Sequence, residues 1–341
     1  MRIAVIHGDL EKPFPYYPNQ DWDSNDNGVL RRLHDALASL RDHSFAFFSA
    51  HDTLWRDLER SRAEYDLVLN LCDDGFMNDP DRALHVCAML DVLGVPYTGS
   101  GVVAMAMTAD KQAQLNVARE LSVRVPATVL VGPRQLVPPD IAYPAIVKPN
   151  TTDGSVGINR RSVVHDATGL AAALRMIREE LRLSCAVLVQ EYLPGTELGV
   201  SIVGNTPHDF NVLPVTEEDY SLLPAELPKI LGYEAKWDQS SPYWQIQTRR
   251  AALSPEVEAY VIACSTKLYE RFRLRDYARF DWRLNGRGEP VFLEANANCG
   301  WCWDGHLAKA AAFAAMSYSD LLNAILTSAA RRNAAALGGP C

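Results

Sequence analysis

The sequence lacks long apolar runs, a targeting signal and an excess of basic residues. No window of the 341 residues approaches the ~20 apolar residues of a membrane-spanning helix. Asp9, Glu11 and Lys12 interrupt the first apolar stretch too early for a signal peptide. Lys and Arg number 33 against 42 Asp and Glu, whereas binding to nucleic-acid phosphates requires clustered basic residues. We therefore expect a cytoplasmic protein with no membrane and no nucleic-acid partner.

Cysteine is scarce and odd in number, with seven residues scattered along the chain. This distribution favours reduced thiols over a disulfide framework. The pair Cys299 and Cys302 has the C-x-x-C spacing of redox and zinc sites, and His306 is the nearest further ligand. A redox pair normally begins a helix behind a strand in a small domain, so two reduced cysteines in a substrate loop are the preferred interpretation.

Several catalytic signatures are also missing. The chain has no H-E-x-x-H, no G-x-S-x-G and no G-x-x-x-x-G-K-[ST] motif. No G-x-G-x-x-G follows the first apolar run, which argues against a nicotinamide oxidoreductase. His7 ends that run and could face a cleft or the core. A lone histidine is more often structural, which favours the core.

The first third of the chain alternates between strand and helix patterns. In order, the patterns predict a strand at 2–7, a helix at 25–40, strands at 45–49 and 65–72, and a helix at 79–94. This order predicts a small doubly wound parallel sheet of the α/β class. Ligands of such sheets lie beyond the carboxyl ends of the strands.

From about Thr108 the pattern becomes that of an α+β protein with antiparallel strands. Residues 216–246 are long, polar and without periodicity, which is typical of a mobile lid or binding loop. We expect three domains, at 1–108, 109–191 and 192–341. The expected elements of the last two are helices at 108–123, 167–182 and 255–272, strands at 127–132, 143–149, 185–193, 197–204 and 209–215, a hairpin at 277–297 and two Ala-rich helices at the end.

The hairpin carries oxygen ligands on one face. Glu294 and Asn296 alternate along its second strand, and Arg279 and Asp281 alternate along its first. Mg²⁺ prefers one or two carboxylates together with phosphate oxygens. Both strands are strongly apolar, so inward carboxylates need a metal or a cationic partner. The alternative is ordinary alternation on the surface of a hairpin.

Two further stretches have the residue types of a nucleotide site. Lys148 ends a buried strand, and the Gly154–Gly157 turn after it can direct backbone N–H groups at phosphates. The strand, Pro-Gly connector and strand at 187–203 can enclose an adenine ring, with Glu197 accepting from ribose hydroxyls. Each stretch alone is equally compatible with a plain turn between strands.

Together and in order, these stretches resemble the ATP-grasp ligases, and more narrowly the D-alanine–D-alanine ligase family. The resemblance runs from about Gly94 to Leu322 and is carried by "GVPYTGSGVVAMAMTADKQAQLNVARELSVRVPAT", "YPAIVKPNTTDGSVGI", "VLVQEYLPGTEL", "EAKW", "ARFDW" and "FLEANANCGW". It implies a three-domain ATP-grasp fold with ATP between two antiparallel sheets. It also implies an acyl-phosphate intermediate, which an amine attacks.

The resemblance assigns a role to each matching position. ATP phosphates would contact Lys111, Lys148 and Lys236, under a loop of Ser155, Val156 and Gly157. Adenine would lie against Gln190, Glu191 and Leu193, and ribose against Glu197. Mg²⁺ or Mn²⁺ would be held by Asp281, Glu294 and Asn296. The acyl phosphate and the tetrahedral intermediate would be stabilised by Arg279 and the backbone around Gly300.

The sequence departs from the family pattern where amino acids would bind. The family's Gly-Gly-x-Ser-x-Glu stretch reads "HGDLEKPFPYYPNQDWDS", in which Glu11 is the nearest substitute. Gly154, Trp237 and Gly305 stand where the family has Ser, Tyr and Ser. Aromatic residues at 16, 17, 22, 237, 301 and 303 either line a larger pocket or simply pack.

These departures predict a carboxylate–amine ligase for small-molecule substrates. The expected substrates are amino acids other than two D-alanines. The alternatives are a D-alanine–D-alanine ligase proper, an ATP-grasp phosphotransferase or cyclase, and a nucleotide-binding protein without turnover. A homodimer is the default expectation for such an enzyme.

Overall fold

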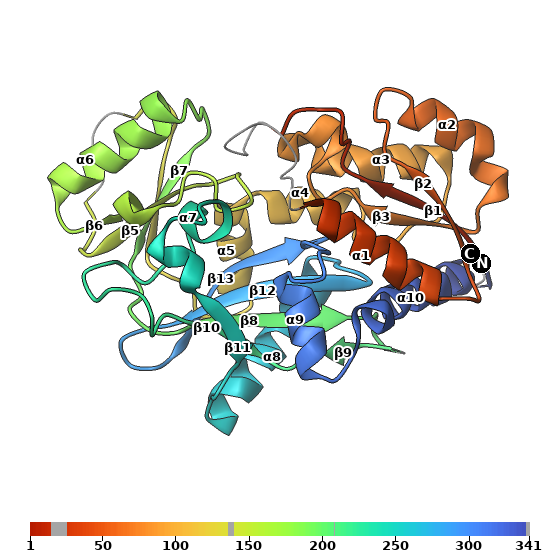
Figure 1. Ribbon diagram of the computed structural model, residues 1–341. Coiled ribbons are helices and arrows are strands. Elements are labelled where there is room, and N and C mark those ends of the chain that lie inside the picture. The colour runs from red at the N-terminus through yellow and green to blue at the C-terminus, as the bar shows by residue number, and fades with distance from the viewer. Residues whose placement is uncertain (15–25, 136–139, 208, 339–341) are drawn as a thin grey trace.

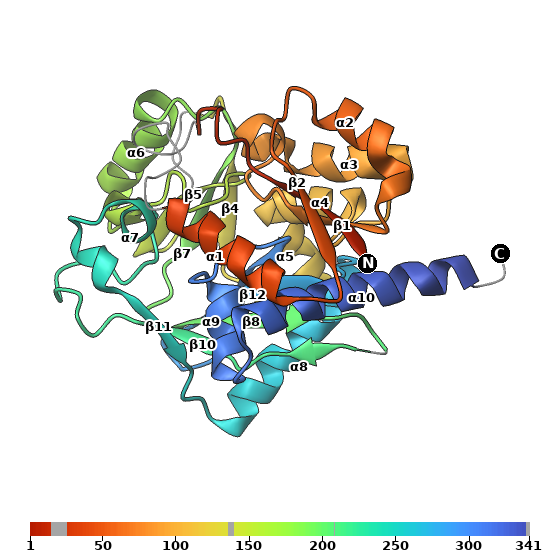
Figure 2. The ribbon, with the colours of Figure 1, turned by 45° about the vertical axis from the view of Figure 1, so that its right-hand side comes forward.

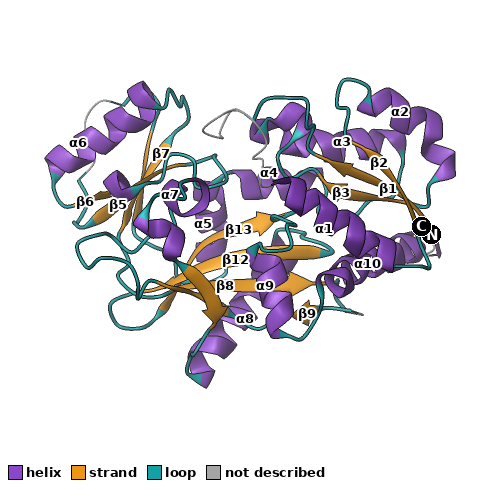
Figure 3. Cartoon of the chain, viewed as in Figure 1, coloured by secondary structure: helices purple, strands orange, loops and turns teal. Residues whose placement is uncertain are grey.

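The computed structural model describes residues 1–14, 26–135, 140–207 and 209–338. Its strands form separate sheets that surround one central region (Figures 1 and 3). The predicted aromatic residues Tyr16, Tyr17 and Trp22 lie outside the described residues. None of the described helices has an apolar stretch of the length and composition needed to cross a membrane.

The N-terminal sheet is parallel and has the strand order β2-β1-β3, as the βαβαβ pattern predicts. Burial explains its apolar sequence, because all of β3 and all but the first residue of β1 are inaccessible. Its elements are β1 (Arg2–His7), α1 (Asp26–Ser39), β2 (Ser44–Phe48), α2 (Leu54–Ser61), β3 (Leu67–Leu71) and α3 (Ala83–Leu93). Gly94, in the left-handed conformation, ends α3.

Two helices follow where the sequence predicted one. α4 (Val102–Ala109) was missed, and α5 (Lys111–Glu120) begins three residues later than expected. Asp110 separates them because its side chain accepts a hydrogen bond from the Ala113 N–H and so caps α5. This cap places Lys111 at the first helical position.

The second sheet is antiparallel, with the order β4-β7-β5-β6. Its strands are β4 (Thr128–Val131), β5 (Ala145–Pro149), β6 (Val163–Val164) and β7 (Val187–Glu191). One face is covered by α6 (Ala167–Arg175), which continues as a π-helical turn over Met176–Glu180. Lys148 leaves this sheet at the end of β5, as predicted.

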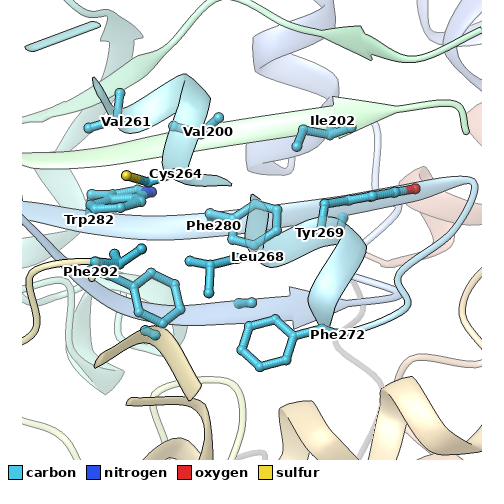
Figure 4. Packing of buried hydrophobic residues seen from close by; sticks show 14 of the residues in the cluster. Val200, Ile202, Val261, Cys264, Leu268, Tyr269, Phe272, Phe280, Trp282 and Phe292 are labelled. Atoms are coloured by element: carbon cyan, nitrogen blue, oxygen red, sulfur yellow. The ribbon is translucent and has the colours of Figure 1, made fainter. Parts of the chain in front are cut away.

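The third sheet contains the predicted hairpin and has the order β11-β10-β8-β12-β13, with β9 paired to β8. Its strands are β8 (Glu197–Val203), β9 (Asn211–Val212), β10 (Thr216–Asp219), β11 (Gln247–Arg250), β12 (Tyr277–Leu284) and β13 (Pro290–Ala297). α8 (Pro255–Arg271) packs under it, with Leu268 against Phe280 and Phe292 (Figure 4). The opposite face is left for polar groups.

The expectation that residues 216–246 lack secondary structure is wrong. The segment begins with β10, which pairs with both β8 and β11, and contains the short helix α7 (Tyr233–Trp237). The acidic sequence of β10 concealed the strand, because Glu217 and Glu218 are buried by partners from β11 and from the C-terminal part rather than by apolar packing.

The chain ends in α9 (His306–Phe313) and α10 (Tyr318–Gly338). α10 packs against α1 of the N-terminal part and extends outward from the body of the molecule (Figure 2). Asp276, fully buried before β12, receives hydrogen bonds from Arg332 of α10, Asn205 and the backbone N–H of Gly99. One carboxylate therefore connects the N-terminal part of the sequence to the C-terminal part.

Candidate active site

One large cavity, of about 1890 Å³, lies among the three sheets. Residues from β5, β7, α7, β12, β13 and the loops after β1 and β3 line it. Of the residues predicted to bind ATP, metal or intermediate, all except Gly157 are in its wall. Gly157 lies in the same loop but packs against the Pro149 ring. Its φ of +82° and this close contact leave no room for a side chain.

The hairpin presents its oxygen ligands side by side. Asp281 stands opposite Glu294 in the antiparallel register, and Arg279 stands opposite Asn296. Arg279 donates two hydrogen bonds to Asp281, Nε to Oδ1 at 2.6 Å and a terminal nitrogen to Oδ2 at 2.9 Å. The Asn296 amide donates to the same Oδ2 at 2.9 Å. The alternation predicted for these strands therefore brings the four side chains together.

Buried lysines balance the carboxylates. Lys111 lies 3.3 Å from Glu294 Oε2, and it also donates to the Thr152 carbonyl. Lys111 and Lys148 are only 5% and 6% exposed. Burial lowers the pKa of Lys148, whereas for Lys111 the carboxylates of Glu294, Asp153 and Asp281 together outweigh burial and raise the pKa. These two cations are the charges that a nucleotide phosphate would meet.

The donor set fits a hard divalent cation. Burial acts to raise the pKa of Asp281 and Glu294, but the surrounding cations, chiefly Arg279 for Asp281 and Lys111 with Lys148 for Glu294, together lower it, so both carboxyls are ionised at neutral pH. Among the described residues, no group of three or more His, Cys, Asp or Glu side chains has metal-site geometry. A cation here would thus take the two carboxylates, the Asn296 amide oxygen and phosphate oxygens, a combination usual for Mg²⁺.

The phosphate loop is attached to the segment that carries Lys236. Ser155 Oγ donates to the Leu231 carbonyl at 2.9 Å, and the Tyr233 N–H donates to Ile158 O at 2.7 Å. The Trp237 indole N–H donates to the Gly154 carbonyl at 3.2 Å. Gly154 and Ser155 both have positive φ, at +63° and +61°, which turns the loop sharply at this contact. The loop and α7 therefore form one connected part of the cavity wall.

Replacing Trp237 with phenylalanine should raise the KM for ATP about fivefold, because it removes one hydrogen bond worth roughly 1 kcal/mol. The aromatic packing of the position is retained. The measurement is steady-state ADP formation with varied ATP. Trp55→Phe, at an exposed position of α2 outside the cavity, is the matched control. An unchanged KM in Trp237→Phe would show that this contact does not hold the loop over ATP.

The opposite end of the cavity has the features of a nucleoside pocket. Gln190 and Leu193 are buried in its wall, and the Glu191 side chain accepts from the Ala127 N–H at 2.9 Å. Glu197 Oε2 accepts from Tyr220 and from Arg283, each at 2.9 Å. Both bonds engage Oε2, so Oε1 is available to a ribose hydroxyl. Burial raises the pKa of Glu197, and the Arg283 charge counteracts it.

Comparison with known proteins identifies the family. A family model described as "D-ala D-ala ligase C-terminus" matches residues 132–327. The D-alanine–D-alanine ligase of Cupriavidus necator is 30% identical over 71% of this chain and 70% of its own length. The uncharacterized protein y4sG of Sinorhizobium fredii is 33% identical and is matched over 97% of this chain and 98% of its own. The chain belongs to the D-alanine–D-alanine ligase family.

Solved structures agree on the ATP-grasp fold of this ligase. A D-alanine–D-alanine ligase from Bacillus anthracis complexed with ATP superposes with a TM-score of 0.71 at 21% identity, covering 98% of this chain and 99% of that one. The VanG D-Ala:D-Ser ligase from Enterococcus faecalis gives a TM-score of 0.68 at 17% identity, covering 96% and 99%. The protein is therefore an ATP-dependent ligase that forms carbon–nitrogen bonds.

A further part of the cavity wall is built from the loop after β13 and the end of β3. The Trp301 indole donates to Asp73 Oδ1 at 2.9 Å, and a side chain at Gly300 would contact the other oxygen of Asp73. Burial raises the pKa of Asp73 to about 6, against the effect of the Trp301 hydrogen bond. Arg32 lies 3.9 Å above the Trp303 ring at the rim. The predicted aromatic residues 237, 301 and 303 all line the cavity.

Cys299 and Cys302 are reduced thiols in the cavity wall. Burial raises the pKa of Cys299 to about 12, so this thiol is not a nucleophile at neutral pH. His7 is buried at the end of β1, with Nδ1 at 2.8 Å from the Gly8 carbonyl, and is not in the wall. His7 is therefore a core histidine, as preferred from the sequence.

Sequence reasoning missed several residues of the ligase site. Arg283 continues the alternation of Arg279 and Asp281 along β12, a signal that was present in the sequence. Asp73 follows a predicted strand at its carboxyl end, where ligands of parallel sheets bind. Glu218 and His306 had no usable signal, because β10 was not recognised and the two residues are far apart in the chain.

Proposed function

We propose that this ligase joins the carboxylate of one amino acid to the amine of another, and that the pair is not two D-alanines. The observation that carries the proposal is a contrast between two sets of positions in the family pattern. At the nucleotide end every matching family residue except Gly157 lines the wall. Where the family has polar side chains, this chain has Gly154 and Trp237 in the loop and helix beside the phosphates and Gly305 just before α9.

The N-terminal loop supports the same conclusion. Glu11, the nearest substitute for the family's ammonium-binding glutamate, is exposed and is not in the cavity wall. Among the described residues of this part of the chain, the carboxylates in the cavity wall are Asp73, Asp74 and Asp81, all after β3. An ammonium group of the substrate would therefore meet carboxylates from a different strand end than in the family pattern.

The proposed mechanism uses charge neutralisation and positioning. Lys111, Lys148 and Lys236 would hold the ATP phosphates, and Arg279 would meet the carboxylate as it attacks the γ-phosphorus. A Mg²⁺ or Mn²⁺ ion on Asp281, Glu294 and Asn296 would supply further neutralisation of phosphate charge. The loop at Ser155 and α7 would exclude water from the acyl phosphate. Backbone N–H groups near Gly300 would stabilise the tetrahedral intermediate before phosphate leaves.

The division into domains at 1–108, 109–191 and 192–341 belongs to this proposal, as does a homodimeric assembly. Each predicted domain carries one sheet and supplies a different part of the cavity wall. ATP would then lie between the second and third sheets, with the amino acids toward the first.

The test is phosphate release from Mg-ATP with D- and L-amino acids, singly and in pairs, followed by mass spectrometry. We expect release that requires two amino acids and a product whose mass is their sum less water. Turnover with D-alanine alone would make the protein a D-alanine–D-alanine ligase proper. A phosphorylated product would indicate phosphotransfer, and loss of water from a single substrate would indicate cyclisation. Either of the last two outcomes would refute ligation.

A further inference from the structure

A histidine and a glutamate outside the predicted site lie in contact in the cavity wall. His306 begins α9, and Glu218 lies on β10. His306 Nε2 is 3.2 Å from Glu218 Oε1, with the glutamate side chain 8% exposed and the histidine 24%. Both residues line the cavity. Figure 1 shows α9 lying across the face of the third sheet, where β8 and β11 contact it.

Glu218 is held in a fixed orientation. Thr248 Oγ1, on the neighbouring strand β11, lies 3.2 Å and 3.1 Å from the two oxygens of the Glu218 carboxylate. The pKa of Glu218 is lowered although burial acts to raise it, because His306 and Thr248 contact the carboxylate. A carboxylate only accepts hydrogen bonds, so the proton of a neutral His306 ring lies on Nε2.

This tautomer leaves the lone pair on Nδ1. The buried side-chain atoms without a hydrogen-bond partner in the described part of the chain are Nε of Arg178 and Arg283, Oε2 of Glu234 and the Tyr318 hydroxyl. Nδ1 of His306 is not among them, and none of the described hydrogen bonds engages it, so it is open to the cavity. An imidazole with one nitrogen held by a carboxylate and the other open is the arrangement of a general base.

The charged groups around His306 place it at the reacting end of the cavity. Arg279 and Asp281 of β12, Lys236 of α7 and Glu218 of β10 all interact with it electrostatically. Lys309, one turn further along α9, also lines the cavity. Burial and the Arg279 charge lower the pKa of His306 below its ordinary 6.5, while Glu218 counteracts them. The ring is therefore neutral at neutral pH.

We propose that His306 is the general base for the acceptor amine and that Glu218 is its positioning residue. This inference rests on the proposed ligase function. An amino-acid amine is protonated at neutral pH and cannot attack until it loses a proton. The ammonium proton would move to Nδ1, and the neutral nitrogen would form the C–N bond. The C–O bond to phosphate would break with its electron pair leaving on phosphate, which takes the second nitrogen proton.

The alternative is that the pair only attaches α9 to the sheet. Hydroxylamine separates the two readings, because its nitrogen is unprotonated at neutral pH and needs no base to attack an acyl phosphate. The experiment measures hydroxamate formation from each amino acid of the panel with Mg-ATP and hydroxylamine, and amide formation from the amino-acid pair. The variants are His306→Gln, Glu218→Gln and the exposed control His85→Gln, which lies outside the cavity.

We expect His306→Gln to keep hydroxamate formation within twofold while amide formation falls about 10²- to 10⁴-fold, the usual contribution of a general base. Glu218→Gln should show the same split with a smaller loss, and His85→Gln should show none. Retained hydroxamate formation also demonstrates that a variant is folded. Amide formation by wild type should fall as the pH drops through the His306 pKa, and in His306→Gln the profile should instead follow the acceptor amine.

Other outcomes overturn the inference. Equal loss of hydroxamate and amide in His306→Gln and Glu218→Gln would show that the pair is structural or binds the donor. Unchanged amide formation would show that His306 takes no proton. If wild type forms no hydroxamate with any amino acid, the ligase proposal fails and the inference fails with it, which distinguishes that case from a failure of His306 alone.

Discussion

Glutamine in place of Glu294 is expected to lower the rate of ADP formation by about 10²- to 10³-fold, the range found when one preorganised electrostatic group is removed. The carboxylate stands opposite Asp281 and 3.3 Å from Lys111, on the face of the hairpin that lines the cavity. Glutamine has the same shape but no charge. It would leave two buried lysines with less counter-charge and a divalent cation with one carboxylate instead of two.

The control for this variant is Glu289→Gln, just before β13. Glu289 pairs with Arg124 and Asn285 at the exposed end of the same hairpin and is not in the cavity wall. Its replacement should leave activity unchanged. Titration with Mg²⁺ separates the roles further, because a metal ligand should raise the Mg²⁺ concentration required at half-maximal rate. A Glu294→Gln enzyme with wild-type rate and wild-type Mg²⁺ dependence would remove Glu294 from the site.

Asparagine in place of Asp276 is expected to cost roughly 3 to 5 kcal/mol of unfolding free energy, the range for breaking a buried ion pair. The carboxylate is fully buried and accepts from Arg332, Asn205 and Gly99. Asparagine also tolerates the positive φ of this residue, +66°, so backbone strain is not the cause. The loss comes from Arg332, which would keep its hydrogen bond to the Tyr97 carbonyl but lose the carboxylate that balances its charge.

Chemical denaturation followed by circular dichroism measures this loss, with Glu180→Gln as the control. Glu180 forms a two-bond pair with Arg161, but both side chains are more than half exposed, so the pair contributes little in water. A midpoint for Asp276→Asn equal to that of Glu180→Gln would show that the Asp276 network does not hold the N-terminal and C-terminal parts of the chain together.

Local patterns in the sequence predicted most of the nucleotide end of the site. Alternation placed Arg279 and Asp281 on one face of β12 because successive strand side chains point to opposite sides. The apolar residues between them, Phe280 and Trp282, pack on α8, which confirms the period. The phosphate loop and Lys148 were found for a similar reason, since a loop after a buried strand needs only local residues to be recognised.

The elements that the sequence misassigned share a physical cause. β10 is acidic and short, and its burial depends on Arg249 and His306 from distant segments. α4 and α5 read as one helix with an unassigned stretch before it, because the capping role of Asp110 is set by one side-chain hydrogen bond. Neither the strand β10 nor the boundary between α4 and α5 follows from a repeat of apolar residues. Both could be assigned only from the tertiary contacts.

The sequence by itself determined the fold class, the family and the side chains proposed to bind the nucleotide, because these follow from periodicity and from short motifs in a fixed order. The tertiary structure decided which carboxylates reach the cavity wall. Glu11 is exposed, whereas Asp73 lines the cavity, since the parallel sheet directs the end of β3 inward. The tertiary structure also brings Glu218 and His306 into contact. These residues are 88 positions apart, so their contact depends on how α9 packs on the third sheet.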